Sequence, residues 1–134
     1  MVDDCVFCKM VKGEIEVAKI YEDDKHLVFM DGFPYLKGQV LVIPKKHVKN
    51  YLDMQEEDYL DLMKLSRKIA EAMKQAFKPL VVALVIEGLE VPHVHVKLYP
   101  IRQGEYLGIP AGEKPEQKEL AELSEVIKKQ LKMD

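Results

Sequence analysis

Hydrophobic and polar residues alternate over short stretches in the first third of the chain. Residues 18–22 and 26–31 each have the two-residue period of a strand and are separated by a polar turn. A loop rich in glycine and proline at 32–38 precedes a third apolar strand at 39–43, which ends at Pro44. The pattern therefore predicts three strands joined by short connections.

A three- and four-residue apolar period follows and predicts a long helix over residues 54–77. Asp53, with Glu56 three positions later, has the pattern of a helix N-cap. The apolar stripe of this helix comprises Leu62, Leu65, Ile69, Ala72 and Ala76. A final helix is expected to begin near Pro115, because proline is favoured in a first helical turn.

Two further strands are expected between these helices. Residues 80–87 form an uninterrupted apolar run, which is typical of a strand in the centre of a sheet. Pro92 opens a last strand at 93–99, which ends at Pro100. Because several of the five strands are linked directly by short turns, we predict an α+β fold with an antiparallel sheet and two main helices. The length of 134 residues indicates one domain, 1–134.

The last strand carries the residues that are most informative about function. Polar and apolar residues alternate there, so His93, His95 and Lys97 project from one face while the apolar residues between them face the core. A single strand histidine is more often a structural residue, but two beside a lysine favour a functional site. This cluster suits a reaction at phosphorus, in which an imidazole attacks and a cation neutralises phosphate charge. The attacking ring needs an acceptor such as a backbone carbonyl at its other nitrogen.

The two cysteines form a single Cys5-x-x-Cys8 pair, which is either a redox dithiol or half of a zinc site. A redox pair of this spacing usually follows a strand, and no strand precedes this one, so zinc is favoured. A closed site would add two of the four histidines. His47 follows Pro-Lys-Lys at a strand end and is either a ligand on a fixed backbone or an exposed histidine.

Asp31, at the end of the second strand, also has two interpretations. Either its carboxylate accepts hydrogen bonds from the hydroxyls of a ribose, as an acidic residue at a strand end does in dinucleotide-binding folds, or it caps the backbone of its own turn.

Net charge and composition limit the classes of binding partner that are expected. The chain is 48% hydrophobic and 32% charged with a net charge of −3, so no global positive field recruits nucleic acid or an anionic membrane. The acidic start of the chain lacks a signal-peptide core, and the apolar runs are too short to span a bilayer, which makes a cytoplasmic location the expectation. A subunit this small often forms a homodimer.

These residues resemble the histidine triad (HIT) family of nucleotide-binding hydrolases and transferases. The resembling segments are Cys5-Val6-Phe7-Cys8-Lys9, the run from Asp31 to His47 with its Pro44-Lys45-Lys46, and Glu90-Val91-Pro92-His93-Val94-His95-Val96. The resemblance implies a homodimer that binds a purine nucleotide or nucleotide conjugate, with the α-phosphate at the histidine strand. His95 would attack that phosphorus and form a nucleotidyl-histidine, with Lys97 beside the phosphate. Asp31 would bind the ribose, and Leu27 and Phe29 would form walls around the base.

The resemblance also implies a ligand set for the metal. In relatives with this cysteine pair, a structural Zn²⁺ ion is held by residues that correspond to Cys5, Cys8, His47 and His93.

Two departures from the family pattern bear on activity. Lys97 replaces the third histidine, and a lysine is a poor proton shuttle at neutral pH. Glu90 lies in the loop that approaches the phosphate and would repel it. The alternative function is therefore a nucleotide-binding protein with little or no catalysis.

Overall fold

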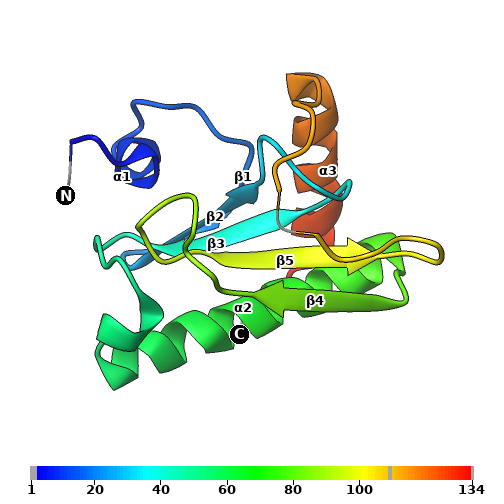
Figure 1. Cartoon of the computed structure of the whole chain (residues 1–134). Helices are drawn as coiled ribbons and strands as arrows, with labels where there is room; N and C mark the ends of the chain where they lie inside the picture. The colour runs from blue at the N-terminus through cyan, green and yellow to red at the C-terminus, as the bar shows by residue number, and fades with distance from the viewer. Residues whose placement is uncertain (1–2, 109, 134) are drawn as a thin grey trace.

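An antiparallel sheet forms the centre of the protein (Figure 1). The computed structural model describes residues 3–108 and 110–133, and within these ranges the sheet has five strands in the order β1-β2-β3-β5-β4. The strands are β1 (Lys19–Glu22), β2 (His26–Met30), β3 (Val40–Pro44), β4 (Val81–Val85) and β5 (Val96–Ile101). Every neighbouring pair is antiparallel, which confirms the predicted α+β architecture.

Helices cover both faces of the sheet. In the described part of the chain they are α1 (Val6–Val11), the 3-10 turn η1 (Tyr51–Asp53), α2 (Glu56–Phe77) and α3 (Gln117–Gln130). Figure 1 shows α1 on one side of the sheet and α2 running along the other. Two of the helices are long, as the apolar periods predict, and α1 is a short helix that the sequence did not predict.

Strand alternation divides the apolar residues between two cores. Val28 and Val42 join the stripe of α2 and the apolar side of α3 in the larger core. Leu27, Phe29 and their neighbours on β3 face the other way and pack against α1. The apolar residues on either side of His95, Val94 and Val96, lie in the larger core, so the predicted alternation around His95 is confirmed.

The predicted helix starts need correction. Asp53 ends η1 and does not cap α2, whose N-cap is Gln55 without a side-chain capping bond. The first turn of α2 instead holds three acidic residues, which favour a helix N-terminus electrostatically. The last helix begins at Gln117, just after the predicted start at Pro115.

The placement predicted for residues 80–87 is wrong. Val81–Val85 of this run form β4, which lies at the edge of the sheet and exposes Val81 and Leu84 to solvent. The last strand is also shifted, since β5 begins at Val96 and continues through Pro100. Pro100 is tolerated because β3 pairs with β5 only as far as Leu98, so beyond that point the strand has a neighbour on one side.

Membrane-spanning helices are absent from the described residues, because none of the helices there is both long and apolar enough. Met1 and Val2, which open the acidic start of the chain, lie outside the described residues.

Candidate metal centre and nucleotide site

Two cysteines and two histidines converge between α1 and the sheet. Cys5 is the N-cap of α1 and Cys8 lies in its first turn, so the helix brings both sulfurs to one side. His47 follows β3 and His93 precedes β5, two strands that are neighbours in the sheet. The four donor atoms all lie within 4.8 Å of one another, so the predicted ligand set is brought together.

Four of the six distances between these donor atoms are close to those of a tetrahedral metal site. Cys5 Sγ lies 3.4 Å and Cys8 Sγ 3.6 Å from His93 Nδ1, while His47 Nδ1 lies 3.3 Å from Cys8 Sγ and 3.2 Å from His93 Nδ1. Ordinary zinc–sulfur and zinc–nitrogen bond lengths give tetrahedron edges of about 3.3–3.8 Å. A Zn²⁺ ion therefore fits the centre of this cluster.

The protonation of His93 also suits a metal ligand. Its Nε2–H donates to the carbonyl of Pro44 at 2.8 Å, which leaves the Nδ1 lone pair directed at the sulfurs. Burial lowers the pKa of His93, and the neighbouring His47 and His95 lower it further, so the ring is neutral as a metal ligand must be. Burial raises the pKa of the Cys5 thiol, and metal binding would displace that proton.

His95 lies next to this centre but takes no part in it. The ring is 2% exposed, and its Nδ1–H donates to the carbonyl of His93 at 2.7 Å. This bond fixes the tautomer in which Nε2 carries a lone pair. Burial lowers the pKa of His95, and the charge of Lys97 lowers it further, so the ring is neutral near pH 7. A neutral ring with an accessible lone pair is a competent nucleophile.

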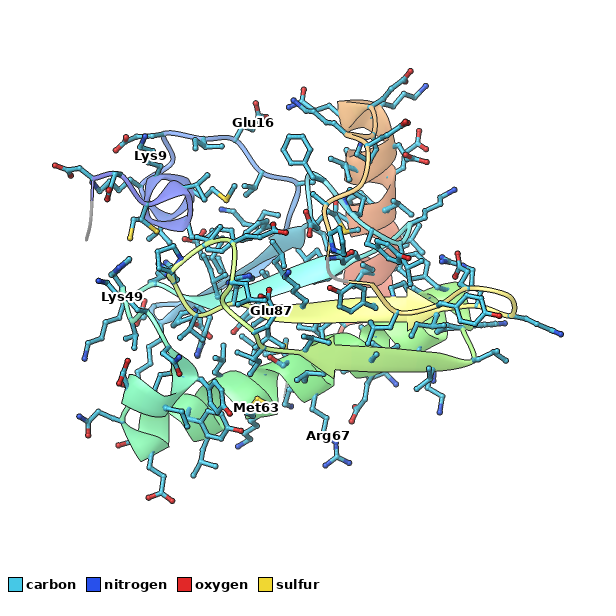
Figure 2. All side chains as sticks on the ribbon, viewed as in Figure 1. Lys9, Glu16, Lys49, Met63, Arg67 and Glu87 are labelled. Atoms are coloured by element: carbon cyan, nitrogen blue, oxygen red, sulfur yellow. The ribbon has the colours of Figure 1, made fainter. Side chains whose placement is uncertain are left out.

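Lys97 is also buried, and its partner is a residue that the sequence did not single out. Lys97 Nζ lies 2.6 Å from Glu87 Oε1, and the same oxygen lies 3.8 Å from His95 Nε2. Figure 2 shows Glu87 near the start of β5. Burial raises the pKa of Glu87, but the adjacent Lys97 ammonium and the hydrogen bond from Leu89 N–H outweigh it and leave the pKa lowered, so the pair is ionic.

The register of β4 and β5, which the sequence does not specify, explains the position of Glu87. Val85 pairs with Lys97 in the antiparallel ladder, so continuing that ladder by two residues brings Glu87 beside His95.

A cavity of about 300 Å³ opens beside His95 and Lys97. This volume is at the lower end of the range for small-molecule sites. Its apolar lining comes from α1 and the facing strands: Val6, Phe7, Met10, Phe29 and Leu41. The Phe7 ring lies over His95, with 4.9 Å between ring centroids, so α1 forms a wall of the cavity. Hollows of about 370 and 480 Å³ lie elsewhere, but His95 lines neither of them.

Asp31 caps its own turn, as one of its two sequence interpretations predicts, and it also lines the cavity. Its Oδ1 accepts a hydrogen bond from Phe33 N–H at 2.8 Å, and its Oδ2 accepts one from Gln39 Nε2 at 2.8 Å. Burial raises the pKa of Asp31, although Phe33 N–H and Lys97 oppose the shift. Each oxygen keeps a second lone pair that can accept from a ligand hydroxyl.

The other residues singled out in the sequence differ in whether they line the cavity. Phe29 lines the cavity, as does Glu90 at its rim. Leu27 does not line it, because Leu27 is buried in the core beneath α1 and borders a separate hollow.

Comparison with known proteins identifies the family. The HIT domain model matches residues 12–104. The chain belongs to the HIT family. It is 36% identical to adenosine 5′-monophosphoramidase of Saccharomyces cerevisiae over 113 residues, which cover 81% of this chain and 72% of that protein. An uncharacterised HIT-like protein of Methanocaldococcus jannaschii is 33% identical over 105 residues, 75% of this chain and 81% of the relative.

Solved HIT structures share the fold. A HIT-like protein from Bartonella henselae superposes with a TM-score of 0.87 at 30% identity, covering 97% of this chain and 98% of that one. A zinc-bound histidine triad protein from Mycobacterium smegmatis has a TM-score of 0.81 at 26% identity, covering 95% and 92%. HIT proteins bind nucleotides and are typically nucleotide hydrolases. The cysteine and histidine cluster described above fits the zinc-containing type within the family.

Proposed function

We propose that this HIT protein splits a nucleoside 5′-phosphoryl group from a phosphoanhydride or phosphoramidate, through a nucleotidyl intermediate on His95. One observation carries the proposal. A buried imidazole, with Nδ1–H held by a backbone carbonyl and Nε2 unprotonated, lines a cavity of mononucleotide size. In the proposed first step, the Nε2 lone pair forms a bond to phosphorus and the bond to the leaving group breaks. Water then attacks phosphorus, the P–N bond breaks, and the electron pair returns to Nε2.

The remaining cavity residues are proposed to bind the nucleotide. Phe29, with the apolar residues of α1 and Leu41, provides a slot for a purine, and Asp31 accepts from the ribose hydroxyls. Lys97 supplies positive charge beside His95, and the Glu87 carboxylate holds it there.

Substituting Asp31 with Asn tests the ribose contact. An amide has one acceptor oxygen where the carboxylate has two, so we expect nucleotide affinity to fall about tenfold. Isothermal titration with AMP measures this. The control ligand is 2′,3′-dideoxy-AMP, which lacks both ribose hydroxyls and should bind equally well to wild type and to Asp31→Asn. Equal affinities of wild type and Asp31→Asn for AMP would contradict the assignment.

Zn²⁺ is proposed to be a structural ion held by Cys5, Cys8, His47 and His93. Two thiolates balance its charge, so the centre adds no net positive charge beside the nucleophile. The ion ties α1 to the sheet and thereby holds the wall of the cavity. Cysteines held as zinc ligands suit a reducing compartment, and we propose the cytoplasm.

Turnover with two substrate types tests the proposed function directly. Purified protein is incubated with adenosine 5′-phosphoramidate and with diadenosine tetraphosphate, and AMP release is followed by chromatography. Rapid quenching in base, where a P–N bond survives, followed by peptide mass spectrometry should locate an adenylyl group on His95. Failure to release AMP from either substrate, together with no adduct, would refute the proposal.

The alternative of binding without turnover is supported by the two carboxylates near the phosphate position. Glu87 already engages Lys97, and Glu90 lines the cavity rim. Micromolar AMP binding without an adduct or AMP release would favour this alternative.

We further propose that the protein is a homodimer paired through the β4 edge. This edge strand leaves backbone groups unpaired and exposes Val81 by 53% and Leu84 by 40%. An isologous contact between two β4 strands would cover both.

Leu84→Glu is expected to dissociate this dimer. A two-fold contact places two new carboxylates close together, which should raise the dimer dissociation constant about 100-fold. Light scattering after size exclusion, at several concentrations, measures the shift. Val126→Glu on α3 is the matched control because Val126 is 39% exposed, and it should leave the mass unchanged. Equal masses for both variants would contradict the proposed interface.

A further inference from the structure

The cavity contains one imidazole and no second one. Among the described residues that line it, His95 is the one histidine. His47 and His93 belong to the metal cluster, and His26 is held by Asp23 at 3.0 Å beside other hollows. Imidazole is the side chain whose ordinary pKa lies near 7. Since His95 is the proposed nucleophile, no other histidine is available to protonate a leaving group.

Lys97 is poorly placed to act as that proton donor. Lys97 Nζ lies 2.6 Å from Glu87 Oε1, and both side chains are almost fully buried. Giving up a proton would neutralise the cation and leave the buried carboxylate without its partner, which is unfavourable. Lys97, held by this ion pair, therefore supplies fixed positive charge to a phosphoryl group and is poorly placed as a proton donor.

The two classes of substrate differ in their need for a proton. When His95 Nε2 attacks a phosphoanhydride, the P–O bond breaks and the leaving phosphate departs with the electron pair as a stable oxyanion. When it attacks a phosphoramidate, the P–N bond breaks, and the nitrogen must gain a proton to leave as an amine. A positioned general acid typically contributes about 10²–10⁴-fold to such a step.

From this arrangement, we propose that the site acts on nucleoside 5′-phosphoanhydrides in strong preference to phosphoramidates of alkylamines. The juxtaposition of His95 with the Lys97–Glu87 ion pair carries this inference, which rests on the proposed function of the same site. Substrates whose leaving group needs no proton, such as dinucleoside polyphosphates and nucleoside diphosphate conjugates, belong to the preferred class.

Leaving-group dependence in the wild-type protein is the first test. Adenosine 5′-phosphoramidates of a graded series, from nitroaniline to aniline to benzylamine, differ in the basicity of the departing amine. We expect kcat/KM to fall at least about 100-fold along the series, because no second imidazole lines the described cavity to protonate the departing amine. Diadenosine tetraphosphate should be cleaved at least about 100-fold faster than the benzylamine derivative. A flat series, or equal rates for the two substrates, would overturn the inference.

Restoring an imidazole gives a second test that loss of folding cannot mimic. Lys97→His should raise kcat/KM for the benzylamine phosphoramidate at least about tenfold, with no gain for diadenosine tetraphosphate. Lys97→Met, which removes the charge without adding an acid, should give no gain with either substrate. A gain in Lys97→Met equal to that in Lys97→His would overturn the inference.

The outcomes also separate the inference from the function on which it rests. Turnover with the wrong leaving-group dependence would refute the inference and leave the nucleotidyl-His95 mechanism standing. Absence of turnover and of adduct with every substrate would refute both.

Discussion

His95→Ala is expected to abolish nucleotidyl transfer. The alanine removes the atom that forms the bond to phosphorus, so AMP release should fall at least about 10⁴-fold and no adduct should form. Rapid-quench mass spectrometry and steady-state AMP release measure the two effects. Since His95 ligates no metal in the proposed centre, zinc content should stay at the wild-type level.

A control variant in the same cavity distinguishes loss of the nucleophile from weaker nucleotide binding. Met10→Ala trims the apolar wall of the same cavity and removes neither a member of the metal cluster nor the imidazole. It should weaken AMP binding while retaining the adduct on His95. If His95→Ala released AMP at the wild-type rate, catalysis through this imidazole would be excluded.

Cys8→Ala is expected to have the largest effect on stability. Cys8 is fully buried, and its sulfur lies within 3.6 Å of both histidine ligands. Structural zinc sites contribute on the order of 10 kcal/mol of binding free energy, which is lost when a thiolate ligand is removed. Zinc content by mass spectrometry should fall close to zero, and the melting temperature by at least about 10 °C.

Cys8→Ala should also weaken nucleotide binding, because α1 forms a wall of the cavity. Wild-type protein treated with a zinc chelator should show the same loss, since the ion and not the thiol side chain is the cause. Retention of full zinc content in Cys8→Ala would contradict the proposed ligand set.

The local sequence pattern was sufficient to predict part of the candidate site. The two-residue period around His95 placed that ring opposite the larger core, and the cysteine spacing indicated half of a metal centre. The remaining ligands, His47 and His93, came from resemblance to the HIT family, because spacing along the chain does not report which strands are neighbours.

What the sequence did not reveal depended on tertiary contacts. The apolar run of β4 has the composition of a central strand, but its position at the edge is set by the order of the strands. Glu87 ends that run, and its pairing with Lys97 follows from a register that no local pattern specifies. The six residues of α1 are too few for propensity to predict a helix, since a helix this short is stabilised mainly by what it packs against.

His93 joins two tasks in one residue. Its ring enters the metal cluster, and its carbonyl accepts from the Nδ1–H of His95 at 2.7 Å. A backbone shift at His93 that withdraws the ring from the cluster also moves the carbonyl that fixes the tautomer of His95. The backbone of His93 therefore links the proposed metal centre to the proposed nucleophile over two residues, so a disturbance of one is expected to reach the other without passing through the rest of the fold.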